Sequence, residues 1–175
     1  MCSSRRLPKL VLTDIDGVWT DGGMYYTENG DELKKFNTSD SAGVIFCRML
    51  DIPVGIVTGE DTQLVERRAD KLKIEYLFKG VGNKRRVVEE LLDKLNLEWD
   101  DVAYIGDDIN DIDVLKDAGF SATPSDAPEY VKKYTSIELS KKGGEGVFRE
   151  FVEKILGKEG VNQAIERFRE LMASR

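Results

Sequence analysis

The sequence predicts an α/β domain with a doubly wound, mostly parallel sheet, and three observations predict it. Four runs of largely apolar residues have the length of strands and are apolar on both faces, as strands covered on both sides are. Amphipathic helical patterns separate these runs, and such alternation favours right-handed crossovers within one sheet. At 175 residues the chain is long enough for one domain with a single core. The strands are expected at residues 7–14, 52–59, 75–80 and 101–108.

The helices expected between these strands each carry apolar residues at helical spacing. In residues 83–95, for example, Val88, Leu91 and Leu95 recur every three or four positions and define one apolar face. Residues 119–124 are expected to form a short further strand of the same sheet. The helices are expected at residues 40–50, 62–73, 83–95 and 110–118.

Residues 22–37 break the alternation and predict a β-hairpin inserted after the first strand. Two strand-like runs flank residues 28–31, and the pair Asn29-Gly30 is a strong turn signal. The hairpin either folds onto its own domain or joins another copy of the chain. We favour the second, because a two-stranded ribbon with so many apolar side chains is marginal alone. These side chains are Met24, Tyr25, Tyr26, Leu33 and Phe36.

The C-terminal part begins with a glycine-rich tail, residues 143–157, that leads into an amphipathic helix. A last, mostly charged helix is expected at residues 161–172. No internal repeat or second-domain boundary is apparent. The expected organisation is therefore one domain over residues 1–157, followed by a helical extension over residues 158–175.

Composition excludes several classes of function. A net charge of −7 and an isoelectric point near 4.8 argue against a nucleic-acid partner. The chain has no histidine, which excludes histidine bases, Ser/His or Cys/His pairs and His-ligated zinc. Cys2 and Cys47 show no paired spacing, so no disulfide framework is expected. Without a run of transmembrane length or a secretion signal, we expect a cytoplasmic protein with no membrane partner.

Polar residues gather where the predicted strands end. In open α/β sheets, ligands bind beyond the carboxyl ends of the strands. A lone Asp after a strand is usually a turn former or a helix cap. Polar residues at four strand ends, in this order, are harder to explain that way. Crowded carboxylates repel unless a cation lies among them, and hard oxygen ligands favour Mg²⁺. The residues are Asp14, Asp16, Thr58, Gly59, Glu60, Lys84, Asp107, Asp108 and Asp111.

Four of these stretches resemble the four motifs of the haloacid dehalogenase superfamily of phosphatases. They are "DIDGVWTDG", "VTG", Lys84 and "GDDIND", and the resemblance spans about residues 7–156. It implies a Rossmann-like core in which Asp14 is the nucleophile that forms an aspartyl-phosphate. Asp16 would be the general acid and base, and it favours a phosphatase because the related ATPases have Thr there. The resemblance further implies that Mg²⁺ is held by the Asp14 side chain, the Asp16 backbone carbonyl and Asp107.

The same resemblance implies roles for the remaining residues at the strand ends. Thr58 and the backbone N–H of Gly59 would bind a phosphate oxygen, and Lys84 would supply the opposing positive charge. Asp108 and Asp111 would lie behind them, positioning Lys84 and metal-bound water.

The spacing of the motifs leaves no room for a cap domain. Only 43 residues separate Asp14 from Thr58, and 22 separate Lys84 from Asp107. A capless site is open to water, so such enzymes act on macromolecules or take a lid from a neighbouring subunit.

The chain resembles the capless sugar-acid phosphatases, in which hairpins assemble a homotetramer and each subunit covers its neighbour's site. "FNTSDSAG" (residues 36–43) and "GGEGVFRE" (residues 143–150) carry the resemblance further. It implies that Thr38 and Asp40 line the site, and that the glycine-rich tail enters the adjacent subunit. The substrate would be a small phosphorylated sugar acid.

One position bears on the choice of sugar acid. Phosphatases of 3-deoxy-manno-octulosonate (KDO) 8-phosphate commonly have Arg after the Thr-Gly pair, where this chain has Glu60. Glu60 could pair with Lys71 as a solvent-facing ion pair or accept sugar hydroxyls, and Arg68 could hold the sugar carboxylate. This set resembles the phosphatases of the nonulosonate KDN 9-phosphate, in sialic acid-type biosynthesis, more closely.

The expected activity is therefore Mg²⁺-dependent hydrolysis of KDN-9-phosphate. The alternative is the KDO-8-phosphate phosphatase reaction of lipopolysaccharide biosynthesis. Two further alternatives are a macromolecule phosphatase with an open monomeric site and a non-catalytic partner of a cytidylyltransferase.

Overall fold

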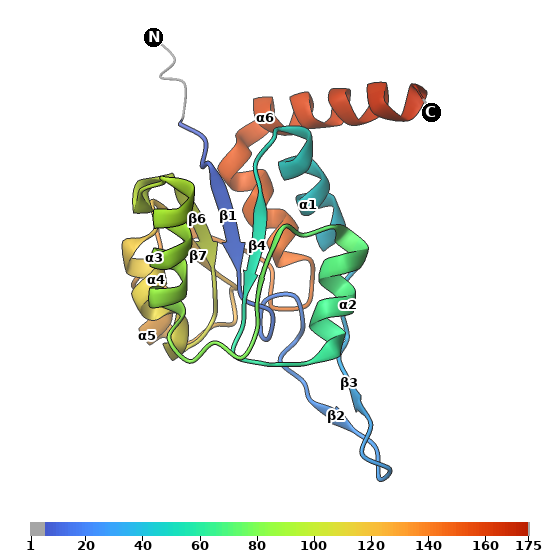
Figure 1. The fold of residues 1–175 in the computed structure, drawn as a ribbon, viewed down its shortest axis with the longest axis vertical. Helices are drawn as coiled ribbons and strands as arrows, with labels where there is room; N and C mark the ends of the chain where they lie inside the picture. Colours follow the sequence, from blue (N-terminus) through green and yellow to red (C-terminus); the bar gives the residue numbers. More distant parts are fainter. Residues whose placement is uncertain (1–5, 175) are drawn as a thin grey trace.

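The computed structural model describes residues 6–174, and its centre is a six-stranded sheet in which every pairing is parallel (Figure 1). The strand order is β5-β4-β1-β6-β7-β8, so the chain winds outward in both directions from β1. This confirms the predicted doubly wound α/β class. The strands are β1 (Leu10–Thr13), β4 (Val54–Val57), β5 (Tyr76–Phe78), β6 (Val102–Ile105), β7 (Phe120–Thr123) and β8 (Ile137–Glu138).

Helices cover both faces of the sheet, as the doubly apolar strands predict (Figure 1). Val11 packs into the cluster on one face, whereas its neighbours Leu10 and Leu12 pack into the cluster on the other. The first face is covered by α1 (Asp40–Met49), α2 (Gln63–Leu72) and α6 (Val147–Ala173). The second is covered by α3 (Lys84–Leu95), α4 (Ile112–Asp117) and α5 (Glu129–Lys132), and short 3₁₀ turns lie at Trp99–Asp101 and Ile109–Asp111.

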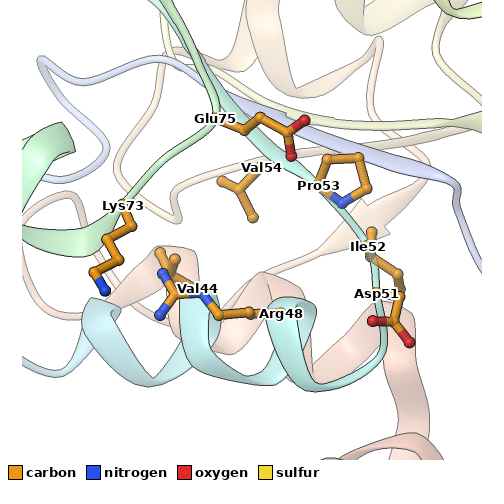
Figure 2. Close-up of a pocket in the computed structure, with 8 residues that line it drawn as sticks. All are labelled: Val44, Arg48, Asp51, Ile52, Pro53, Val54, Lys73 and Glu75. Atoms are coloured by element: carbon orange, nitrogen blue, oxygen red, sulfur yellow. The ribbon is translucent and has the colours of Figure 1, made fainter.

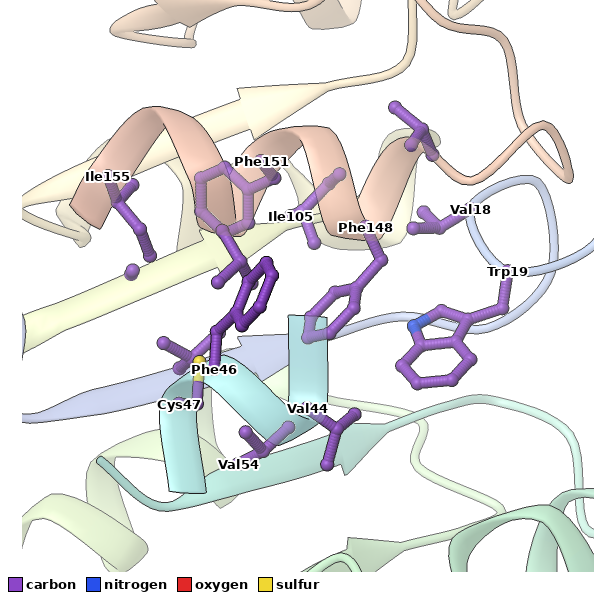
Figure 3. Close-up of a cluster of buried hydrophobic side chains, with 14 of the residues drawn as sticks. Val18, Trp19, Val44, Phe46, Cys47, Val54, Ile105, Phe148, Phe151 and Ile155 are labelled. Carbon is purple, nitrogen blue, oxygen red and sulfur yellow. The ribbon is translucent and has the colours of Figure 1, made fainter. Parts of the chain in front are cut away.

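The larger core fixes the loop that follows β1 (Figure 3). The ring of Trp19 lies 4.7 Å from that of Phe148, centroid to centroid, and its Nε1 donates to Thr13 Oγ1 at 3.0 Å. Both ends of the loop that carries Asp14 and Asp16 are therefore held by buried groups. Cys47 lies in the same core as a free thiol, and burial raises its pKa to about 12; Cys2 lies outside the described residues.

The predicted hairpin is present as β2 (Tyr25–Tyr26) and β3 (Glu32–Leu33), and it projects away from the sheet (Figure 1). Tyr26 is 69% exposed and Leu33 57%, so the strands of the hairpin do not fold onto their own domain. Its loop spans residues 27–31, longer than the Asn-Gly pair alone predicts, because Gly30 N donates to Thr27 O at 3.1 Å and closes the turn. Phe36, at its base, packs against the core instead.

The C-terminal segment forms two helical stretches, as the sequence predicts. Both carry the label α6 and meet at a kink at Gly157, where φ is 65° and ψ is 177°, a non-helical conformation. Beyond the kink, Gly160 and Ala164 are buried, and Arg167 Nη1 donates to Met49 O at 2.7 Å. The domain boundary at residue 157 stays a prediction.

No sequence pattern predicted α5 or β8. In the part of the chain that the structure describes, no helix combines the length and the apolar character needed to cross a membrane.

Candidate active site

A pocket of about 300 Å³ lies at the edge of the sheet where β1, β4 and β6 end. Its walls are the loops that directly follow these strands, as the topology predicts for parallel sheets. Of the predicted site residues, seven line it, and Lys84 and Asp111 lie directly behind Asp14. The pocket is lined by Asp14, Asp16, Gly17, Gly22, Thr58, Gly59, Glu60, Asp107, Asp108 and Asn110.

A second hollow, of about 430 Å³, lies between α1 and the starts of β4 and β5 (Figure 2). It is at the amino ends of the strands, on the opposite edge from the carboxylates. It is lined by Val44, Arg48, Asp51, Ile52, Pro53, Val54, Lys73 and Glu75. We therefore place the candidate active site in the smaller pocket.

Lys84 joins two carboxylates at the base of the site. Its side chain is fully buried, and Nζ lies 2.9 Å from Asp14 Oδ2 and 2.8 Å from Asp111 Oδ1. Lys84 is the first residue of α3, whose N-cap Asn83 accepts a hydrogen bond from Arg86 N at 3.0 Å. Burial tends to lower the pKa of Lys84, but the two carboxylates outweigh it and raise the pKa, so the ammonium stays charged.

Asp111 is the structural hub behind the pocket. Its Oδ1 accepts from Lys84 and from the hydroxyl of Tyr104, and its Oδ2 accepts from the backbone N–H groups of Asp107 and Asp108 at 3.0 and 3.1 Å. Both oxygens are therefore occupied by two donors each. Asp111 holds Lys84 and shapes the loop that presents Asp107, the arrangement expected of a group behind the reacting residues.

Three carboxylates crowd together at this point. One oxygen each from Asp14, Asp107 and Asp111 lie within 4.8 Å of one another. Burial, then the charge of Asp111, raises the pKa of Asp14 to about 7, and burial and Asp14 raise that of Asp107 to about 8. Asp14 Oδ1 is buried without a hydrogen-bond donor. An oxygen-only donor set, a free buried oxygen and repelling carboxylates together fit a hard divalent cation.

Gly17 makes room for this cluster. Its φ is +78°, in the left-handed region that favours glycine, and a Cβ there would collide with the carboxylate of Asp107. Glycine at this position is therefore required twice, for the turn after β1 and for the close approach of Asp107.

Asp16 faces the pocket from the other side and contacts a residue that the sequence reasoning missed. Lys34 Nζ donates to Asp16 Oδ1 and Oδ2 at 2.8 and 2.7 Å, and Thr20 Oγ1 donates to Asp16 Oδ1 at 3.3 Å. Lys34 also lies 3.9 Å from Glu60 Oε2. Glu60 therefore pairs with Lys34, and the predicted option of a Glu60–Lys71 pair was wrong.

Two other predicted contacts differ in detail. Thr58 is buried, and its Oγ1 accepts from Glu60 N at 3.3 Å, which shapes the loop after β4. Asp108 does not contact Lys84 as expected, because its Oδ1 accepts from Ile109 N at 2.7 Å and caps the 3₁₀ turn. A role for Asp108 toward metal-bound water stays a prediction.

Four predicted substrate-binding residues lie outside the pocket of their own chain. Asp40 is fully buried and its Oδ1 accepts from Arg149 N at 3.1 Å, so it ties α1 to α6; burial raises its pKa to about 6. Arg68 stacks between Trp19 and Phe36, and its Nη2 donates to Asn37 O at 3.1 Å. Thr38 and Lys71 are exposed and absent from the pocket lining.

Comparison with known proteins identifies the family. The haloacid dehalogenase-like hydrolase family matches residues 40–119. The 3-deoxy-D-manno-octulosonate 8-phosphate phosphatase KdsC of Haemophilus influenzae is 35% identical over 158 residues, which cover 90% of this chain and 88% of that protein. The chain belongs to the haloacid dehalogenase-like hydrolase family. It is a phosphoric monoester hydrolase, as its motifs predict.

Two solved structures of this hydrolase family closely match the fold. One is the KDO-8-phosphate phosphatase from Moraxella catarrhalis in complex with magnesium ion, phosphate ion and KDO. It is 32% identical with a TM-score of 0.83, over 95% of this hydrolase and 92% of that chain. The other is the cobalt-bound phosphatase from Haemophilus influenzae. It is 34% identical with a TM-score of 0.83, and the match covers 92% of this chain and 96% of that chain.

Proposed function

We propose that this hydrolase releases inorganic phosphate from a phosphorylated 2-keto-3-deoxy sugar acid, with Asp14 as nucleophile and Mg²⁺ as cofactor. The observation that carries the proposal is the Asp14 carboxylate, which lines the pocket near Asp107: its buried Oδ1 has no hydrogen-bond donor, while Lys84 holds the other oxygen. A carboxylate nucleophile needs no base to activate it once it is ionised.

The chemistry assigned to the residues follows from their places. Asp14 attacks the phosphorus atom and the ester oxygen leaves, taking a proton from Asp16. Water then attacks the aspartyl-phosphate, gives its proton to Asp16, and frees Asp14. Thr58, the N–H of Gly59 and Lys84 bind the phosphoryl oxygens.

Asp14, the Asp16 carbonyl and Asp107 would hold the metal, which offsets the repulsion between the Asp14 carboxylate and the phosphate. Asp14 contacts Lys84 whereas Asp16 contacts Lys34, and these separate surroundings support different roles for the two carboxylates.

For the substrate, KDO-8-phosphate is the better-supported candidate. The relatives compared above are named for the eight-carbon ester, and one of them was solved with KDO and phosphate. The sequence-based preference for KDN-9-phosphate has no support among these relatives. It remains a second candidate for one reason, which is that Glu60 lines the pocket at the position where KDO-8-phosphate phosphatases commonly have Arg.

Turnover of the two purified esters decides between them. With Mg²⁺, kcat/KM is expected to be higher for KDO-8-phosphate, and a chelator or Asp14→Asn is expected to abolish both activities. Glu60→Arg tests the second candidate, since it should raise the ratio toward the eight-carbon ester only if Glu60 sets the preference. A clear preference of the wild type for KDN-9-phosphate would reverse the assignment, and hydrolysis of neither ester would refute it.

We further propose that the hydrolase is a homotetramer joined through the projecting hairpin. Four exposed apolar side chains, three on the two short strands and Met24 directly before them, need a partner to be covered. Thr38 and Lys71, exposed and outside their own pocket, would then reach a substrate only across a subunit boundary. Sedimentation equilibrium tests the assembly, and a monomeric mass would favour the open macromolecule phosphatase. The cytoplasmic location expected from the sequence stays a prediction.

A further inference from the structure

Lys34 is a buried cation that the hairpin carries into the active site. It directly follows β3, and its side chain is 0% exposed, whereas those of its neighbours Leu33 and Lys35 lie in solvent. Its Nζ reaches Asp16 Oδ1 at 2.8 Å and Oδ2 at 2.7 Å, and Glu60 Oε2 lies 3.9 Å away. The ammonium is therefore placed between two carboxylates that line the pocket.

The contacts have the geometry of a clamp on Asp16. Removing an ammonium from water is unfavourable unless charged partners replace the lost hydration, and both oxygens of Asp16 do so. Charge-assisted hydrogen bonds of this length are stronger than neutral ones and restrict rotation of the carboxylate. Thr20 Oγ1, at 3.3 Å from Oδ1, is the only other side-chain donor to Asp16 among the described residues. Without Lys34, this 27% exposed carboxylate would be held by one long hydrogen bond.

We propose that Lys34 is the positioning residue of the general acid and base, holding the Asp16 carboxylate toward the ester oxygen in the pocket. The proposal rests on the proposed function, because it assigns Asp16 to proton transfer. In the first step the bond from phosphorus to the ester oxygen breaks, a bond from phosphorus to Asp14 forms, and the leaving oxygen takes the proton of Asp16. Proton transfer of this kind depends on distance and direction, so a carboxylate free to rotate is a poorer catalyst.

The hairpin thereby acquires a second role. Lys34 lies in the short segment that joins β3 to the domain. The placement of the hairpin base on the domain therefore sets the position of the ammonium. The same element that presents the apolar surface for assembly also supplies the group that orients Asp16.

The test uses Lys34→Met, which keeps most of the side-chain volume and removes the charge, and Lys35→Ala as the matched control. Lys35 is the next residue, is exposed, and pairs with Asp21 at 3.2 Å outside the pocket. Partners that orient a reacting group commonly contribute about 10- to 100-fold, so kcat of Lys34→Met on the sugar-acid phosphate should fall by about that factor with a smaller change in KM. Lys35→Ala should stay within about twofold of the wild type.

Two further measurements separate positioning from general damage. In an Asp16→Asn background, Lys34→Met should cause no additional loss, because its effect acts through Asp16. In a single turnover of p-nitrophenyl phosphate, release of p-nitrophenol should be nearly unaffected, because that leaving group needs no proton. If Lys34 were merely structural, Lys34→Met would lower the activity on both substrates alike, and its loss would add to the loss caused by Asp16→Asn.

The proposal is overturned if kcat of Lys34→Met stays within about twofold of the wild type. It is also overturned if the losses caused by Lys34→Met and Asp16→Asn add, or if activity on both substrates falls equally. Lys34→Gln serves in place of the Met variant if the latter fails to fold, as judged by circular dichroism. Failure of the proposed function is distinguishable from these results. A wild type that cleaves p-nitrophenyl phosphate but neither sugar-acid ester refutes the function, and the same cycle is then run on glycerol phosphate.

Discussion

In the absence of metal, the hydrolase should lose stability as the pH rises, and Asp14→Asn should prevent much of that loss. Burial and the charge of Asp111 raise the pKa of Asp14 from 3.8 to about 7. A carboxyl with a higher pKa in the folded chain binds its proton more tightly when folded. Its contribution to stability is therefore fully present below about pH 4 and is lost as the pH rises through about 7.

The magnitude follows from the same pKa. Each pH unit between the unfolded and folded values corresponds to about 1.4 kcal/mol, so ionising Asp14 in the folded chain costs about 4 kcal/mol at pH 8. Asparagine has similar shape and no charge, and its side-chain oxygen can still accept from Lys84. We expect Asp14→Asn to exceed the wild type by up to about 4 kcal/mol at pH 8 in a chelator, and to match it near pH 4.

Urea unfolding in EDTA at pH 4, 6 and 8 measures the difference, with Asp113→Asn as the control. Asp113 is an exposed carboxylate of α4 that pairs with Lys116, so its substitution should change little at any pH. Saturating Mg²⁺ at pH 8 should stabilise the wild type, by about 2.7 kcal/mol at 100 times Kd, and Asp14→Asn much less. Equal stability of wild type and Asp14→Asn at pH 8 in EDTA would refute the reasoning.

Three other substitutions probe the parts around Asp14. Lys84→Met leaves buried carboxylates without their partner. Activity in steady-state kinetics should therefore fall by at least about 100-fold, and the free energy of unfolding in urea by about 3–5 kcal/mol. Gly17→Ala adds a Cβ in a left-handed conformation against Asp107. A Mg²⁺ titration of activity should therefore show an affinity for Mg²⁺ reduced by about tenfold or more. An unchanged affinity would argue against the carboxylate cluster as the metal site. Tyr26→Asp on the hairpin should lower the mass in sedimentation equilibrium with an unchanged circular dichroism spectrum, whereas an unchanged mass would place the subunit contact elsewhere.

The sheet was predictable from the sequence because its strands are buried on both faces. Continuous apolar runs located β1, β4, β5 and β6, although each strand is shorter than the apolar run that predicts it, and β7 lies within the short further strand expected at residues 119–124. The elements α5 and β8 have only four and two residues, too few for any periodicity to emerge. Their positions depend on contacts with β7 across the sheet rather than on local pattern.

The reacting side of the site was predictable for a different reason. Asp14 and Thr58 directly follow strands, Asp107 lies two residues after one, and Lys84 begins a helix. Parallel topology brings such positions to one edge. Lys34 lies far from any strand end of the sheet, on a hairpin where a lysine is ordinarily solvated. A lysine followed by a second lysine at the end of a hairpin strand gives no sequence signal for burial, so only the fold of the hairpin base reveals it.

Two residues predicted to bind substrate, Asp40 and Arg68, serve the packing of their own chain, and their role toward substrate stays a prediction. Asp40 precedes a helix in a motif-like stretch, which is also where an acid joins two helices. Arg68 has the spacing of a ligand-binding residue on α2, yet its guanidinium lies over Trp19 and Phe36. Sequence spacing identifies the face of a helix but not what packs against it.

The charge distribution of the pocket sets a requirement on any anionic substrate. Five of the residues that line it are acidic, and the only ammonium groups in contact with them there, within residues 6–174, are those of Lys34 and Lys84. Each of these two already bridges a pair of carboxylates. The positive charge of each is therefore already balanced by carboxylates. Lys84 can still donate a hydrogen bond to a phosphoryl oxygen, but it does not offset the charge of a phosphate dianion, and at short range two like charges repel strongly in a partly buried site. We therefore expect a cation at Asp14 and Asp107 to precede binding of a phosphorylated sugar acid, and the carboxylates expected to destabilise the metal-free fold are the ones that would hold that cation.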